Sequence, residues 1–175
     1  MKQKKMQIRR IVNQTGRMLS LSATLLLLTA CAMRGWMGGG DAIRVTEAGR
    51  SQLCSAEDEN PRVRIFDSAA AVIDWQERTG IRLAEFKALE RGRYALVEMG
   101  QRHTGGYGLA VSREARVVGD SLQLVATFFS PKPGSMRTQM ITSPCVLVHL
   151  TEGNYVGVEV FDQDGQRRAS SRGDA

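Results

Sequence analysis

Short runs of alternating apolar and polar residues, separated by glycine or proline, constrain the fold of this 175-residue chain most strongly. Alternation places apolar side chains on one face of an extended strand, and glycine or proline marks the turns between strands. We therefore expect an α+β, β-rich fold, a mostly antiparallel sandwich or half-open barrel with one covering helix. The pattern predicts five or six strands, over residues 62–66, 94–99, 108–113, 121–129, 145–150 and 155–161.

The segment between the first two of these strands carries the signals of one helix. Asp67 and Ser68 offer side-chain oxygens that can accept hydrogen bonds from a first helical turn, and Gly80 can end the helix. These signals predict a helix over residues 69–78. The leucine and phenylalanine residues of 81–89 also have helical spacing, so we expect a second, short helix there.

The excess positive charge lies at the beginning of the chain. The whole sequence carries 24 Lys and Arg residues against 18 Asp and Glu residues, a net charge of +6. Six of the basic residues and none of the acidic ones lie in residues 1–30. Residues 31–175 therefore hold 18 residues of each sign. This balance removes the electrostatic argument for a nucleic-acid partner.

An apolar run over residues 18–30 follows the basic residues. It is about 13 residues long, too short to span a bilayer, which takes about 20, but it has the length of a signal-peptide core. The run ends in Leu-Thr-Ala directly before Cys31, which resembles a bacterial lipobox. The resemblance implies that residues 1–30 are a lipoprotein signal peptide and that Cys31 carries acyl chains anchored in a bilayer. An ordinary secretory signal with a chance cysteine is the alternative.

The remainder of the chain divides by composition. Residues 31–60 are expected to form the lipidated cysteine and a flexible tether, which includes a run of three glycines. Within this segment and just beyond it, residues 46–61 are polar and predict a loop. The β-rich domain is expected over residues 61–165, and a polar, frayed tail over residues 166–175.

Export also decides how the other cysteines are used. By resemblance to other lipoproteins, Ala32 implies the outer membrane, with the protein on its periplasmic face. Disulfides persist in such a compartment, so we favour a bond between Cys54 and Cys145 over two separate buried thiols. A closed loop of about 90 residues would stabilise the fold by about 4–5 kcal/mol. No further cysteine is left for a zinc site.

Three loops between the expected strands carry the residues best suited to recognition. Adjacent glycines allow another chain to approach closely, and exposed backbone groups of such loops can pair with a partner. The alternative is that these are tight turns that serve folding alone. The candidate partner-binding residues are Gln101, Thr104, Gly105, Gly106, Tyr107, Pro131, Pro133, Gly134, Gln139, Thr142, Ser143 and Pro144.

The same loops carry a family resemblance. Gly-Gln-x-x-Thr-Gly-Gly-Tyr, then Ser-Pro-x-Pro-Gly with a following Gln, then Thr-Ser-Pro and an apolar strand, occur in this order over residues 93–150. This pattern resembles the C-terminal domain of PrcB-type protease-complex lipoproteins. The resemblance implies an exported, non-catalytic module that binds a protein partner, such as a surface protease. The family usually has proline where this sequence has His103.

Other functions have less support in the sequence. The Thr-Gly-Gly-Tyr loop is also similar to a loop of chagasin-type peptidase inhibitors, although the Asn-Pro of that loop is missing here. An envelope structural lipoprotein is a further alternative. The chain has two histidines and neither a Gly-x-Ser-x-Gly elbow nor a phosphate-binding Gly-Lys-Ser/Thr motif, so we expect no enzyme, catalytic residue, metal or cofactor. Asp162-Gln163-Asp164-Gly165 lacks the closing glutamate of a calcium loop and predicts a turn.

Overall fold

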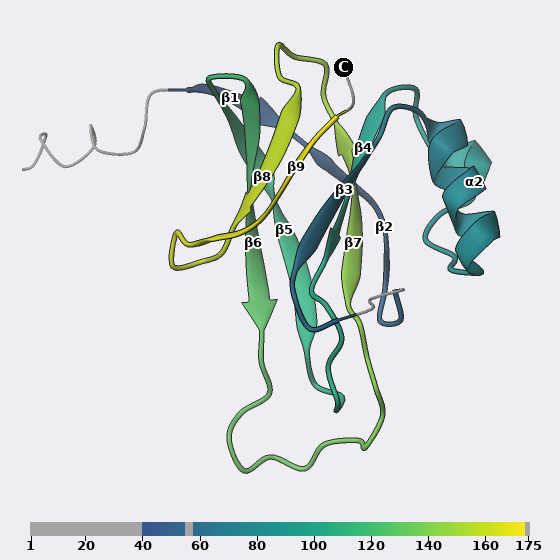
Figure 1. Cartoon of the computed structure of the whole chain (residues 1–175), viewed down its shortest axis with the longest axis vertical. Helices are drawn as coiled ribbons and strands as arrows, with labels where there is room; N and C mark the ends of the chain where they lie inside the picture. The colour runs from purple at the N-terminus through teal and green to yellow at the C-terminus, as the bar shows by residue number, and fades with distance from the viewer. Residues whose placement is uncertain (1–39, 55–57, 174–175) are drawn as a thin grey trace, which may run out of the picture. The chain divides into compact units, whose positions relative to one another are not determined.

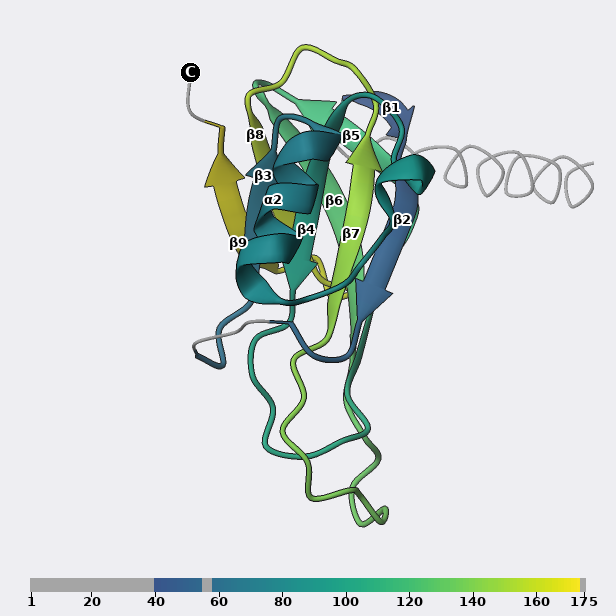
Figure 2. The same cartoon turned by 90° about the vertical axis from the view of Figure 1, so that its right-hand side faces the viewer.

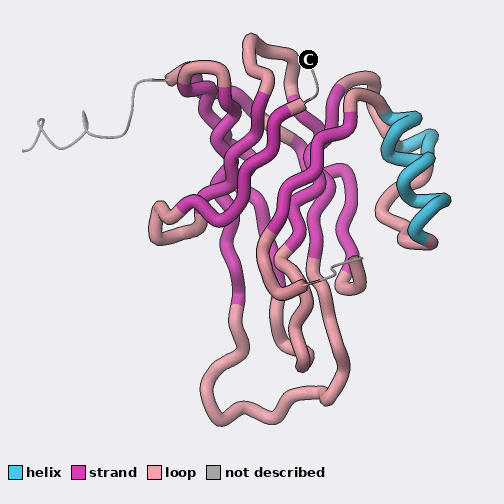
Figure 3. Tube along the Cα trace, viewed as in Figure 1, coloured by secondary structure: helices cyan, strands magenta, loops and turns pink. Residues whose placement is uncertain are grey.

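Strands dominate the computed structural model of this protein, which describes residues 40–54 and 58–173 (Figures 1 and 3). The predicted signal peptide 1–30, Cys31 and the tether as far as residue 39 lie outside the described residues. In the described part, no helix is both long and apolar enough to cross a bilayer. In chain order the elements are β1 (Asp41–Arg44), β2 (Thr46–Ser51), β3 (Arg62–Phe66), α2 (Ala69–Thr79), the 3-10 turn η2 (Phe86–Ala88), β4 (Arg93–Glu98), β5 (Gly108–Val118), β6 (Ser121–Phe129), β7 (Cys145–Leu150), β8 (Gly157–Phe161) and β9 (Arg167–Arg172).

Two sheets form the body of the molecule, with strand orders β1-β5-β6-β8-β9 and β2-β7-β4-β3. Every strand pair is antiparallel except β6 with β8. On one side, the buried residue Val45 carries the chain from β1 in the first sheet to β2 in the second. On the other side, β3 of one sheet lies beside β9 of the other. The predicted β-rich sandwich with one covering helix is confirmed.

The two central strands of the second sheet are buried on both faces. Strand alternation sends Val97 of β4 and Val148 of β7 into the core between the sheets, where they meet Leu122, Leu124 and Val160 of the first sheet. The opposite faces of the same two strands pack under α2 (Figure 2). Burial on both faces explains why β7 reads as an almost continuous apolar run.

Helix α2 begins and ends where local sequence signals place it. The Ser68 hydroxyl oxygen accepts a hydrogen bond from the Ala71 N–H at 3.2 Å, and Gly80, at φ +72°, ends the helix in the left-handed conformation. Val72 and Trp75 are buried against the second sheet, and the Trp75 ring lies 5.9 Å from that of Phe66. The predicted helix is confirmed with one additional residue.

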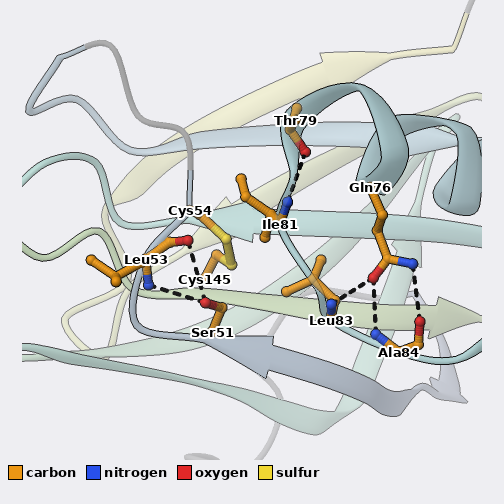
Figure 4. The surroundings of a disulfide bond; sticks show 9 residues. All are labelled: Ser51, Leu53, Cys54, Gln76, Thr79, Ile81, Leu83, Ala84 and Cys145. Carbon is orange, nitrogen blue, oxygen red and sulfur yellow. Dashed lines mark hydrogen bonds between the residues drawn. A yellow bond between two sulfur atoms is a disulfide. The ribbon is translucent and has the colours of Figure 1, made fainter.

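The second predicted helix, over residues 81–89, was wrong except for the three-residue turn η2. Gln76 of α2 explains the difference, because its side chain is 8% exposed and bonds to the backbone of this segment. Its Oε1 atom accepts hydrogen bonds from the N–H groups of Leu83 and Ala84 at 2.5 and 3.0 Å, and its Nε2 atom donates to the Ala84 carbonyl at 3.0 Å (Figure 4). An amide side chain thus satisfies backbone groups that a helix would pair internally.

Two further segments contain strands where the sequence predicted irregular structure. Strands β1 and β2 lie within the predicted tether, and β2 replaces part of the loop predicted over residues 46–61. Strand β9 replaces the frayed tail predicted from residue 166. Neither β2 nor β9 has the apolar alternation that marks a strand in sequence. Each forms because a neighbour with free backbone groups, β7 for β2 and β8 for β9, offers it a partner.

The turn between β8 and β9 is the one predicted from Asp162 to Gly165. The Asp162 carboxylate accepts hydrogen bonds from the N–H groups of Asp164 and Gln166 at 3.0 and 2.8 Å. The Gln166 N–H bond, followed by the Arg168 guanidinium, holds the pKa of Asp162 below its ordinary value. The carboxylate therefore closes a hairpin and is occupied by the chain's own donors.

Gln76 provides the first testable prediction. Gln76→Ala leaves three backbone groups without partners beneath the helix, so we expect a loss of about 1–3 kcal/mol in the free energy of unfolding. The neighbouring exposed residue supplies the control, since Glu77→Ala should change stability by less than about 0.5 kcal/mol. Urea denaturation measures both variants. Equal effects of the two substitutions would show that the amide does not hold this segment.

Candidate functional site

The predicted recognition loops come together at one end of the sandwich (Figures 1 and 3). Residues 99–107 connect β4 to β5, and residues 130–144 connect β6 to β7. Arg102 and Thr142 exchange backbone hydrogen bonds of 2.7 and 2.9 Å, and the Gly105 N–H donates to the Thr138 carbonyl at 2.9 Å. These bonds join the two connections into one surface, called the loop surface below.

A third segment, which the sequence analysis did not include, supports the loop surface. The Ser143 N–H donates to the Gln52 carbonyl at 2.8 Å, and the Cys54 N–H donates to the Ser143 carbonyl at 2.8 Å. Further along, the Gln101 N–H donates to the Asp58 carbonyl at 2.7 Å. Residues 52–54 and 58–60 therefore belong to the loop surface. The signal available in the sequence was the favoured disulfide, which would bring Cys54 beside the Thr-Ser-Pro segment.

That disulfide is present between Cys54 and Cys145, with Cα atoms 6.0 Å apart and a sequence separation of 91 residues (Figure 4). The separation of the Cα atoms is ordinary for a disulfide. Cys145 is the first residue of β7, so the bond ties residues 52–54 to the point where the 130–144 connection re-enters the sheet. The disulfide therefore stabilises the base of the loop surface.

Arg102 braces the loop surface from within. Its guanidinium donates to three backbone carbonyls, from Nη1 to Glu59 at 2.9 Å and to Gln101 at 3.0 Å, and from Nη2 to Met99 at 2.8 Å. It also lies over the ring of Tyr107, 5.7 Å from the ring centre. Sequence reasoning missed Arg102 because its partners are backbone groups, which have no sequence signature.

His103 makes one exposed contact. Its Nε2 atom lies 2.8 Å from the Glu59 carboxylate, and both side chains are mostly exposed. The contact adds a second link between residues 58–60 and the loop 99–107.

The glycine pair lets the two connections of the loop surface approach each other closely. Gly105 is buried, and a Cβ atom there would lie 2.2 Å from the Thr138 hydroxyl. Gly106 has φ +88°, and a Cβ atom there would lie 2.9 Å from the Pro131 Cβ. The close approach that these glycines allow is therefore one between the two connections of the same chain.

The remaining predicted residues divide into those that shape the loop surface and those that face solvent. Buried residues cannot touch a partner directly, so they act by positioning their neighbours. Thr142 illustrates this, since its hydroxyl donates to the Thr104 carbonyl at 3.1 Å. The buried residues are Gly105, Thr142, Ser143 and Pro144; the half-buried ones are Gln101, Thr104, Tyr107 and Pro131; the exposed ones are Gly106, Pro133, Gly134 and Gln139.

Exposed apolar side chains occur at the end of β6 and along the longer connection. Phe129 is 52% exposed, Met136 is fully exposed, and Met140 and Ile141 are each 53% exposed. Single exposed apolar residues are ordinary, but four along thirteen residues are not. These residues carry neither a turn signal nor a hydrogen-bonding group, so the sequence pattern did not indicate them. No Asp or Glu occurs in residues 130–144, which carry Lys132 and Arg137.

A small pocket opens where the three segments meet. Its volume is about 360 Å³, and its walls come from Glu59, Gln101, Arg102, His103, Thr104, Tyr107, Ser130 and Arg137. The walls are polar, in contrast to the neighbouring apolar side chains. The loop surface thus combines a polar pocket with four exposed apolar side chains, called the apolar tip below: Phe129, Met136, Met140 and Ile141.

The described part of the chain contains no candidate metal site. There, no three His, Cys, Asp or Glu side chains are grouped so that they could hold a metal ion. His149 packs against the ring of Tyr94 at 5.0 Å and bonds through Nε2 to the Arg91 carbonyl at 3.1 Å. Strand alternation places this histidine opposite Val148 and Leu150, as predicted.

Substitution of one glycine tests whether the two connections of the loop surface press against each other. Gly106→Ala and Gly134→Ala each place a side chain at positive φ, at a cost of about 1–2 kcal/mol. Only Gly106→Ala also drives a methyl group into Pro131, so we expect it to lower the free energy of unfolding by at least about 1 kcal/mol more than Gly134→Ala. Thermal unfolding of both variants tests this. Equal losses would mean that the connections do not press on each other at Pro131.

Comparison with known proteins gives one match. The family model described as PrcB C-terminal matches residues 93–151, which run from β4 through β7 and include both connections of the loop surface. No curated protein and no solved structure matches the chain. The match confirms the family resemblance of the loop motifs. Over residues 93–151, this chain is therefore similar to the PrcB C-terminal family.

Proposed function

We propose that this protein is a membrane-anchored, non-catalytic subunit of an envelope complex, and that its loop surface binds a protein partner associated with proteolysis. The family match supports the association with a protease complex. The single observation that carries the binding role is the group of four exposed apolar side chains on residues 129–141. Apolar side chains exposed to water are unfavourable, so a group of four favours a surface that a binding partner covers.

The support beneath these side chains favours binding. Backbone hydrogen bonds at Thr138, Thr142 and Ser143 fix the second half of the long connection, which the disulfide ties to the sheet, and Arg102 braces the neighbouring loop. A surface ordered before association loses less conformational entropy when a partner docks. Two of the four apolar residues, Met136 and Met140, have flexible, polarizable side chains that adapt to a partner's shape.

The direction of the strands suits an anchor at the N-terminus. Asp41 pairs with Val117 near the end of β5, whereas the loop surface adjoins Gly108 at the start of β5. The chain therefore enters the described domain at the end remote from the loop surface. In our proposal, Cys31 is acylated and the protein is held at the periplasmic face of the outer membrane.

The anchor is tested by Cys31→Ala. Because acylation needs the thiol, we expect this variant to move from the membrane fraction to the soluble fraction of cell extracts. Serine at the adjacent position supplies the control, since Ala32→Ser keeps the thiol and should stay in the membrane fraction. Membrane retention of Cys31→Ala equal to that of the unchanged protein would contradict the lipid anchor.

The partner-binding role is tested by capture from membranes, with a tag at the C-terminus. Gly173 bonds to Val156 at the end of the sandwich remote from the loop surface, so such a tag leaves the loops free. Met136→Ser with Met140→Ser should reduce recovery of the partner at least about tenfold, since apolar anchors dominate binding energy. The control removes two exposed apolar groups elsewhere, Phe86→Ser with Val156→Ser, and should bind normally.

The captured protein distinguishes the candidate roles. Recovery of an exported protease whose activity is maintained or increased supports an accessory subunit. A recovered peptidase whose activity falls indicates an inhibitor, and recovery of porins or peptidoglycan indicates a structural lipoprotein. Equal recovery by the methionine variant and its control would contradict the assignment of binding to the loop surface.

A further inference from the structure

The polar pocket of the loop surface presents an excess of hydrogen-bond donors. Two guanidinium groups, one amide and three hydroxyl groups line it, and Glu59 supplies its one carboxylate. That carboxylate already lies 2.8 Å from His103 Nε2. A ligand that fits this lining must supply acceptors.

The charge of Arg102 is fixed at the pocket and is not neutralised by an acidic side chain. All three of its guanidinium bonds go to backbone carbonyls, which orient the group without cancelling its unit charge. Among residues 40–54 and 58–173, no carboxylate forms an ion pair with it. Because the side chain is half-buried, water screens this charge less than it would on an open surface.

A second cation reaches the pocket from the long connection. Arg137 makes one long hydrogen bond, from Nη2 to the Lys132 carbonyl at 3.3 Å, and it has no ion-pair partner in the described part of the chain. Lys132 lies in the same connection and adds positive charge nearby. Arg137 is therefore free to pair with a ligand that enters between the loops.

Four neutral polar side chains complete the lining. The side chains of Gln101, Thr104, Tyr107 and Ser130 form no hydrogen bond with any described residue, although other polar groups of the same loops are paired. A carboxylate offers two oxygens with several acceptor positions and is matched by a guanidinium together with neutral donors. Apolar groups flank this lining in sequence, with Phe129 before Ser130 and Met136 before Arg137.

We propose that the pocket between Arg102 and Arg137 binds a carboxylate group of the protein partner, supplied by an acidic side chain or by a chain terminus. This inference rests on the proposed function, because it takes the ligand to be part of a protein docked on the loop surface. The apolar tip supplies affinity. The pocket fixes the position at which the partner docks, because it holds the partner's carboxylate at one defined place.

The experiment titrates three matched small molecules into the full-length chain carrying Cys31→Ala. N-acetylglutamate α-amide has a side-chain carboxylate, N-acetylglutamine has a terminal carboxylate, and N-acetylglutamine α-amide has none. We expect saturable NMR shifts at the amides of Gln101, Thr104 and Arg137 with at least one carboxylate probe, weakened by added salt. The tighter of the two probes identifies the source of the carboxylate. Equal shifts with the neutral probe, or no saturable shift with either carboxylate probe, would overturn the inference.

A charge substitution provides the second arm. Arg137→Gln should weaken binding of the carboxylate probe at least about threefold, because it removes one charge-assisted pair. Arg78→Gln, at an exposed position near the end of α2, is the matched control and should leave binding unchanged. Arg137 is exposed and makes one long bond, so its replacement leaves the Arg102 brace intact. Equal probe affinity of both variants would overturn the assignment to Arg137.

The outcome separates the pocket from the function of the loop surface. The probe titration needs no partner, so carboxylate binding without capture of any protein would retain the pocket and contradict the proposed function. A captured partner whose affinity is unchanged by Arg137→Gln would retain the function and contradict the pocket.

Discussion

The antiparallel pairing of β4 with β7 is the constraint on which the rest of the structure depends. Ala95 pairs with Val148 and Leu96 with Leu147, so alternate side chains of both strands enter the two cores. One core is closed by the first sheet and the other by α2. Because both faces are buried, a shift of one residue between these strands would exchange the two cores and bury neither well.

The same strand pair sets the position of the loop surface. Glu98, the last residue of β4, pairs with Cys145, the first of β7, so both connections leave the sheet at one place. Their backbones continue to pair beyond the sheet, through Met99 with Pro144 and Arg102 with Thr142. The loops are therefore an extension of the β4–β7 ladder, held further by the disulfide at Cys145.

Stiffness and exposure are divided between different residues of the loop surface. Buried glycine, threonine, serine and proline residues hold the connections together, whereas methionine, isoleucine and phenylalanine side chains project into solvent. In our proposal, this division lets a partner dock without much reordering of the loops. The neighbouring cations at Arg102 and Arg137 would then decide which partner segment fits, since an unpaired charge disfavours the wrong one.

The sequence by itself determined the features whose causes are local. Apolar alternation predicted β3 and β6 with their observed bounds, and the cap at Ser68 with the stop at Gly80 predicted α2. The loop motifs predicted the family match over residues 93–151 and the two connections that form most of the loop surface. The tertiary structure alone decided the rest: β2 and β9 are polar strands stabilised by the edges that they join, and Gln76 and Arg102 act on backbone carbonyls and N–H groups of segments elsewhere in the chain. Backbone groups are the same in every residue, so a sequence cannot show which of them a distant side chain will reach.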